Sequence, residues 1–276
     1  MRKPTDFTRL MTSYLGSYLP LQRNVSKNTI SSYCDTFRLL LTFLRDEKSM
    51  SIERLRIQDF TPSLIREYLS WLGRDRHCGI STRNQRLAAL RAFFKYVEVE
   101  SLEHMLLCQK IINIPYTKKE QASVCYLTTE EMACILRQPD QSSRAGRRDL
   151  CFLSLLYDTG ARVSEILSLK ARDVHLSDPA KVILYGKGRK LCEVPILPNT
   201  VLHLRQYMAE QGLSAPEKLD RQFFVNRQGN PLTRAGAAYI LNKYVQMAGI
   251  DTHVSPHVLR HTKAMHLLEA GVNIFY

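Results

Sequence analysis

Three cationic side chains stand close together near the end of the chain. His257, Arg260 and His261 are three and four residues apart in the stretch SPHVLRHTKAMHLLEAG. This stretch predicts a helix, because Ser255 can cap its first turn and Pro256 suits its first helical position. Residues three and four apart are neighbours on a helix surface, so the three side chains are expected to form one cationic cluster. Such a cluster is suited to binding an anion.

Two more cations occur at turns earlier in the chain. Arg162 follows the turn in YDTGARVSEILSL, with Glu165 three residues further on, and Lys187 lies in the Gly-Lys-Gly turn of ILYGKGRKLCEVPI. Taken singly, these residues are typical of a local ion pair and a solvated hairpin turn. Together with the cluster, however, they place guanidinium, ammonium and imidazole groups in one half of the chain, where they can bind an anion.

A metal site is an alternative for the histidines of HVSPHVLRH, which are His253, His257 and His261. The spacing of the last two permits a shared metal ion. The segment nevertheless lacks the Glu of a His-Glu-x-x-His zinc motif, and Arg260 would repel a cation. We therefore expect no metal and no cofactor.

Composition indicates which anion to expect. The chain has 276 residues, 45% of them hydrophobic, and a formal net charge of +13. This charge favours a polyanionic partner, most often nucleic acid. The seven cysteines are scattered without a Cys-x-x-Cys pair, which is typical of reduced thiols. Because no apolar run is long enough to span a membrane, we expect a cytoplasmic protein with no membrane partner.

Helical periodicity dominates the first hundred residues. Apolar residues recur at helical spacing in 26–47, after a cap at Ser26 or Asn28, in 63–73, after Thr61-Pro62, and in 81–98. The third stretch carries four cations on its flanks, which are Arg83, Arg86, Arg91 and Lys95. By themselves they could be a solvated face.

The second half predicts a mainly helical unit with one β-hairpin. Thr128 and Glu131 form a capping box, and 181–197 contains two β-prone runs around the Gly-Lys-Gly turn. Asn199 is expected to cap the next helix, and 223–225 is expected to be a short strand. The predicted fold class is therefore mainly α with a small antiparallel β-sheet, in two domains at 1–105 and 127–276 joined by a linker at 106–126.

Several of these stretches resemble the tyrosine recombinases of the phage integrase family. TGARVSEILSLKARDV, ILYGKGRKLCEVPI and SPHVLRHTKAMHLLEAGVN are similar, in order, to the family's first Arg box, its catalytic-lysine hairpin and its His-x-x-Arg box. SKNTISSY and STRNQRLAALRAFFKY are similar to the family's helical, SAM-like core-binding domain. The resemblance covers nearly the whole chain.

The resemblance implies both an activity and the residues that perform it. Family members cleave and rejoin DNA through a 3′-phosphotyrosine, in site-specific integration and recombination. The resemblance implies that Arg162 and Arg260 bind the scissile phosphate and that Lys187 protonates the leaving 5′-oxygen. It also implies that His257 hydrogen-bonds the phosphate and assists proton movement, and that Glu165 orients one of these catalytic side chains. Arg189 and Lys190 are nearby alternatives for the hairpin cation, although Lys187 matches the family's Gly-Lys-Gly position, and both are expected to contact DNA.

The resemblance also implies the partners. Family members close around duplex DNA and form a tetrameric synapse, so Arg83, Arg86, Arg91 and Lys95 become expected DNA contacts. We expect alanine at Arg83 and Arg86 together to weaken DNA binding and leave the fold intact.

The chain departs from the family after Gly271. Family members continue with a helix bearing a Leu-Gly-His box and another bearing the nucleophilic Tyr, and neither motif follows here. Tyr276 is a poor substitute because it is the last residue. We therefore expect a recombinase incomplete at its C-terminus, limited to DNA binding and forming no covalent DNA adduct alone. The alternative is a non-catalytic DNA-binding protein that competes with a full-length recombinase.

Overall fold

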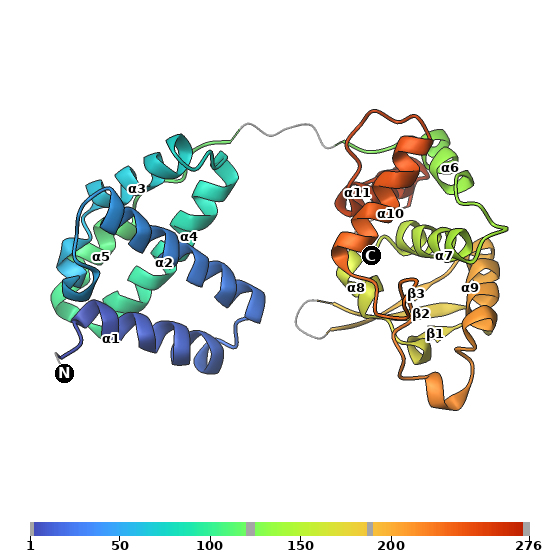
Figure 1. Ribbon diagram of the computed structural model, residues 1–276, viewed down its shortest axis with the longest axis horizontal. Helices are drawn as coiled ribbons and strands as arrows, with labels where there is room; N and C mark the ends of the chain where they lie inside the picture. Colours follow the sequence, from blue (N-terminus) through green and yellow to red (C-terminus); the bar gives the residue numbers. More distant parts are fainter. Residues whose placement is uncertain (1–2, 120–124, 187–189, 273–276) are drawn as a thin grey trace. The chain divides into compact units, whose positions relative to one another are not determined.

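The computed structural model describes residues 3–119, 125–186 and 190–272 (Figure 1). The chain forms two compact units, Met1–Gln121 (unit 1) and Ala122–Tyr276 (unit 2). Both are built mainly from helices, and unit 2 also holds a small antiparallel sheet. The predicted fold class is therefore confirmed. Among the described residues, no helix is both long enough and apolar enough to cross a membrane.

Unit 1 is helical in all its regular elements within the described residues. Its elements are α1 (Asp6–Ser13), η1 (Tyr14–Gln22), α2 (Lys27–Asp46), η2 (Ile52–Arg54), η3 (Ile57–Asp59), α3 (Pro62–Arg74), α4 (Ile80–Glu100), η4 (Leu102–His104) and α5 (Met105–Ile112). The predicted caps are confirmed, because Ser26 accepts the N–H of Thr29 and Thr61 accepts the N–H of Leu64. The core is aromatic: the Phe93 ring, for example, meets those of Phe7, Tyr14 and Phe37.

The prediction that the linker begins at residue 106 is wrong. Residues 105–112 form α5, whose Cys108 and Ile111 are fully buried in the core of unit 1. Asn84 on α4 also exchanges two hydrogen bonds with the backbone of Thr117, at 2.8 and 3.1 Å. The segment therefore stays attached to unit 1 well beyond residue 106, because burial of its apolar side chains outweighs its lack of a clear sequence pattern.

Unit 2 surrounds a second hydrophobic core. Its elements are α6 (Thr129–Arg137), α7 (Arg144–Thr159), α8 (Val163–Ser168), η5 (Ala171–Asp173), β1 (Val174–His175), β2 (Lys181–Tyr185), β3 (Leu191–Pro195), α9 (Pro198–Gln211), η6 (Pro216–Lys218), α10 (Arg234–Met247) and α11 (Pro256–Glu269). The sheet order is β1-β2-β3, and β2 and β3 form the predicted hairpin, in which Tyr185 pairs with Leu191 next to the connecting turn. The apolar helix α7 lies at the centre of the unit and contacts both α9 and α11.

Two local predictions in unit 2 are wrong. The N-cap of α9 is Leu197 rather than Asn199, because Pro198 occupies the first helical position, where its fixed φ and missing N–H cost nothing. The segment 223–225 is not a strand: Val225 makes only an isolated bridge to Pro231, and Phe223 and Phe224 are core residues. In contrast, the capping box of Thr128 and Glu131 is confirmed.

Candidate active site

The turn between α7 and α8 presents Arg162. Gly160 ends α7 in the left-handed region, with φ 57°, and Arg162 is the N-cap of α8. The backbone N–H of Arg162 donates to Glu165 Oε2 at 2.8 Å, and its Nη1 donates to Glu165 Oε1 at 2.8 Å. The Glu165 side chain is 10% exposed and that of Arg162 is 48% exposed. The carboxylate thus fixes one edge of the guanidinium and leaves other N–H groups facing solvent.

The β-hairpin ends beside this pair. The N–H of Gly186 donates to the carbonyl of Lys190 at 2.8 Å, which closes the described part of the hairpin. A Cβ atom at Gly186 would lie 3.8 Å from Glu165 Oε1. Lys190 is exposed, whereas Lys187 and Arg189 lie outside the described residues. The position immediately before Lys187 is therefore at the Arg162–Glu165 pair.

Helix α11 carries the cationic cluster on its exposed side. Ser255 caps this helix by accepting the N–H of Val258 at 3.4 Å, as predicted. His257, Arg260 and His261 are all exposed, while Leu259 and Thr262 between and beside them are fully buried. The burial pattern confirms that the three cations share the solvent side of one helix.

A contact between α7 and α11 links the two arginine segments. A Cβ atom at Gly160 would lie 3.4 Å from Lys263 Cγ, and Lys263 Nζ is 3.8 Å from Asp158 Oδ1. The Lys263 ammonium also lies 5.2 Å from the centre of the Tyr157 ring. Because Arg162 is two residues after Gly160 and Arg260 is three residues before Lys263, this contact constrains the separation of the two arginines. We call Tyr157, Asp158, Gly160 and Lys263 the α7–α11 clamp.

His266 extends the clamp to the beginning of unit 2. Its Nε2 lies 2.9 Å from the carbonyl oxygen of Leu127, and its Nδ1 lies 2.7 Å from the hydroxyl of Tyr157. A carbonyl can only accept, so in the neutral ring Nε2 donates to Leu127 and Nδ1 accepts from Tyr157. Burial and the adjacent Asp158 raise the pKa of the Tyr157 hydroxyl, which keeps it protonated as this donor.

No sequence motif indicates the contacts that Lys263, His266 and Asp158 make. The only available signal is spacing: Lys263 and His266 lie three and six residues after Arg260, on a helix whose other side must be buried. Asp158 gives no such signal, because its partners come from elsewhere in the chain. Its Oδ2 accepts the N–H of Leu197 at the start of α9, at 2.7 Å.

Replacing Lys263 by Met is expected to lower the free energy of unfolding of unit 2 by about 1–3 kcal/mol, because the buried Asp158 carboxylate loses its cation. Met keeps most of the packing on Tyr157. The matched control is Lys243→Met on α10, since Lys243 also lies over a tyrosine ring, at 4.6 Å from Tyr244, but is exposed. Urea denaturation measures the free energy of unfolding of both variants. Equal losses of this free energy would show that Lys263 does not stabilise the buried Asp158 carboxylate.

The four cations of α4 differ in their surroundings. Arg86 Nη1 donates to the carbonyl of Ser32 at 2.9 Å and to Thr36 Oγ1 at 3.1 Å, both on α2. Arg83 lies against Gly73 on α3, Arg91 lies 4.7 Å from the ring centre of Tyr116, and Lys95 is exposed. Arg86 therefore joins α4 to α2, which argues against our expectation that the Arg83/Arg86 double variant would leave the fold intact.

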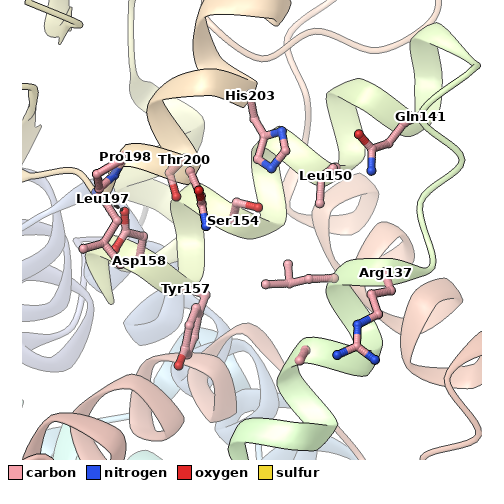
Figure 2. A pocket seen from close by; sticks show the side chains of 13 residues that line it. Arg137, Gln141, Leu150, Ser154, Tyr157, Asp158, Leu197, Pro198, Thr200 and His203 are labelled. Atoms are coloured by element: carbon pink, nitrogen blue, oxygen red, sulfur yellow. Dashed lines mark hydrogen bonds between the residues drawn. The ribbon is translucent and has the colours of Figure 1, made fainter.

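A cavity of about 670 Å³ lies between α6, α7 and α9. Figure 2 shows Tyr157, Asp158, Ser154 and His203 around it. Its lining is mostly apolar, and burial lowers the pKa of His203, which favours the neutral imidazole. Among the predicted phosphate-binding residues that the structure describes, none lines this cavity. The candidate active site therefore consists of the exposed residues of the Arg162 turn, of the hairpin end and of α11, which the contacts of Gly186 and Gly160 connect.

The chain is similar to known proteins along nearly its whole length. The profile of the phage integrase family matches residues 125–275, and that of the phage integrase N-terminal SAM-like domain matches residues 13–101. The protein y4rC of Sinorhizobium fredii is 35% identical over 280 residues, covering 99% of this chain and 83% of that protein. Tyrosine recombinase XerC of Bacillus subtilis is 34% identical over 277 residues, covering 99% and 86%.

The fold is also similar to a solved structure, that of the XerH site-specific recombinase bound to its difH substrate in a pre-cleavage complex. The two share 21% of their residues, with a TM-score of 0.69, over 95% of this chain and 74% of the other. At this identity, the similarity concerns the fold.

Proposed function

The chain belongs to the phage integrase family, and from this premise we propose that it acts as a site-specific DNA recombinase of the tyrosine recombinase type. The observation that best supports the proposal is the constrained pair of arginine segments, in which Glu165 orients Arg162 and the clamp holds α7 to α11 beside Arg260. Duplex DNA is the proposed substrate, which agrees with the net charge of +13.

The chemistry requires these residue types. When a tyrosine oxygen bonds to the phosphorus and the bond to the 5′-oxygen breaks, negative charge grows on the nonbridging oxygens. Arg162 and Arg260 can each present paired N–H donors to that charge without a metal ion. In the proposal, Lys187 gives a proton to the departing 5′-oxygen, and His257 hydrogen-bonds the phosphate. The attacking tyrosine is assigned to no residue.

The proposal includes the positions of the remaining cations. Lys190 and Arg189 on the hairpin, and Arg91 and Lys95 on α4, contact backbone phosphates and fix the register of the duplex. Arg83 and Arg86 contribute to this surface mainly by supporting α4. Self-association of the chain on DNA, with four copies as in the family's synapse, belongs to the same proposal.

Duplex binding tests the proposal directly. We expect the affinity of the chain for a 30-base-pair duplex to fall by about 10³-fold or more between 50 and 200 mM salt, as counterion release predicts for about six or more phosphate contacts. Lys95→Ala is expected to reduce the slope of log affinity against log salt by about 1. Fluorescence anisotropy measures both quantities.

The matched control is Arg38→Ala in the same unit, because Arg38 is already paired with Asp35 at 2.9 Å on the surface of α2. Its slope is expected to equal that of the unaltered protein. Binding that does not respond to salt, or no binding at low salt, would contradict the proposed function.

A further inference from the structure

The cavity of about 670 Å³ between α6, α7 and α9 has the size of a small-molecule site, for which roughly 300–1,000 Å³ is usual. Most of its lining is apolar and comes from the helices and from the start of α9 (Figure 2). The apolar residues are Ala133, Leu136, Leu150, Leu197 and Pro198. Because water gains little from such a lining, an apolar molecule displaces it favourably.

Two buried hydroxyl groups face this cavity without a partner. Ser154 on α7 is 7% exposed and Thr200 on α9 is 5% exposed, and both line the cavity. Neither side chain forms a hydrogen bond with any residue that the structure describes. A buried hydroxyl without a partner costs free energy, and in native proteins such groups are usually satisfied.

These two side chains are exceptions within unit 2. The other buried polar side chains that the structure describes there all form hydrogen bonds; they are Asp149, Asp158, Glu165, Asp173 and Thr262. Both exceptions line the same cavity. The missing partners are therefore expected to belong to a molecule that occupies it.

His203 adds a third polar group to the same wall. It lies three residues after Thr200 on α9, and its side chain forms no hydrogen bond with a described residue. Burial lowers the pKa of His203, and the neutral imidazole can donate at one nitrogen and accept at the other. The carboxylate in the lining, that of Asp158, already faces Lys263 at 3.8 Å, and Arg137 is exposed. The buried part of the wall thus offers hydrogen bonds without an unpaired charge.

We propose that this cavity binds an uncharged, mainly apolar organic molecule that carries a hydroxyl, carbonyl or ring-nitrogen group. The apolar body packs against the leucines of α6 and α7, and the polar group bonds to Ser154, Thr200 and His203. Tyr157 and Asp158 line the cavity and also belong to the α7–α11 clamp. The bound molecule therefore contacts two of the residues that hold α7 to α11.

The probe for this site is 2-naphthol, which joins two aromatic rings to one hydroxyl group. Calorimetric titration of the full chain is expected to show saturable binding, with a dissociation constant of about 1 mM or tighter for a ligand of this size. The melting temperature is expected to rise with the concentration of 2-naphthol, because the probe binds only the folded protein.

The hydroxyl groups are tested by Ser154→Ala combined with Thr200→Val. The affinity for 2-naphthol is expected to fall about tenfold or more as hydrogen bonds to the probe are lost. The melting temperature of the empty variant is expected to stay constant or rise, since two unpaired hydroxyls leave the interior. A lower melting temperature with unchanged affinity would assign the hydroxyls to the fold and overturn the inference. The matched control, Ser214→Ala/Thr252→Val, removes two exposed hydroxyls that do not line the cavity and is expected to change neither quantity.

A second variant blocks the cavity itself. Ala133→Phe places a ring in it and is expected to abolish binding of 2-naphthol. Binding that survives unchanged in both this variant and Ser154→Ala/Thr200→Val, or no saturable binding to the unaltered protein, would overturn the inference. Tighter binding of 2-naphthoate than of 2-naphthol, lost in Arg137→Ala, would assign the cavity to carboxylates and overturn the uncharged ligand. Since these measurements use no DNA, a failure to bind duplex DNA would contradict the proposed function alone.

Discussion

Alanine at Asp149 is expected to lower the free energy of unfolding of unit 2 by about 3–5 kcal/mol, the usual cost of leaving a buried charge without its partner. The Asp149 side chain is 4% exposed and that of Arg148 is 14% exposed. Asp149 Oδ2 also accepts the hydroxyl of Tyr244 on α10 at 2.9 Å. Burial and this carboxylate raise the pKa of Tyr244, so the hydroxyl remains a donor. Urea denaturation measures the loss.

Two variants separate the causes of that loss. Tyr244→Phe removes one hydrogen bond and is expected to cost about 1 kcal/mol. Arg148→Met combined with Asp149→Leu removes both charges and is expected to recover much of the stability, because desolvation of the pair is removed with it. If the double variant is no more stable than Asp149→Ala, the loss comes from packing rather than from the orphaned guanidinium.

Local features of the fold could be predicted because each depends on a few neighbouring residues. The caps at Ser255 and Thr128 require only a hydroxyl and the N–H groups of the next turn. The hairpin requires only two β-prone runs and a turn between them. The α9 start shows the limit of this approach: Asn199 is a good cap by type, but Pro198 precedes it, and Asp158 on α7 accepts the N–H of Leu197.

The supporting contacts of the candidate site could not be predicted, because they join distant parts of the chain. Lys263 and Asp158 become neighbours only when α11 packs on α7. Neither residue indicates in the sequence where its partner lies. Arg86 shows the same effect in unit 1. Its position on a helix flank suggested a solvent-facing cation, whereas its guanidinium donates to Ser32 and Thr36. Side-chain direction depends on packing that the helical period alone does not determine.

The residues of the candidate site were proposed from the sequence by type and position, but their arrangement was not. Family resemblance predicts Arg162 and Arg260 as phosphate-binding residues from short motifs, and the structure places them on segments that the clamp joins. The cavity of about 400 Å³ at the start of α7 gave no motif, because Arg144 and Arg227, which line it, come from a helix start and a separate turn. Their charges were part of the net charge of +13, and only folding brings them to one cavity.

Alanine at Arg260 is expected to reduce the rate of DNA strand cleavage by about 10²–10³-fold, the usual cost of removing one transition-state donor. The rate is measured in a protein–DNA assembly that supplies the attacking tyrosine. Binding of the same duplex is expected to weaken by only about tenfold at 0.1 M salt, because one phosphate contact is lost. The difference arises because the charge on the nonbridging oxygens grows during the reaction, so the guanidinium stabilises the transition state more than the bound duplex. Arg260→Lys is expected to restore binding more than cleavage, since an ammonium cannot present paired donors.

The control for Arg260 is Arg137→Ala, which removes an exposed arginine from the end of α6 in the same unit and is expected to change neither quantity. Because Arg260 is exposed on α11 and forms no ion pair with a described residue, its variants are expected to keep the melting temperature of the unaltered protein. Equal losses of binding and cleavage in Arg260→Ala would mean that Arg260 only attracts DNA. An unchanged cleavage rate would contradict the assignment of Arg260 to the candidate active site. It would also contradict a catalytic role for the contact between α7 and α11.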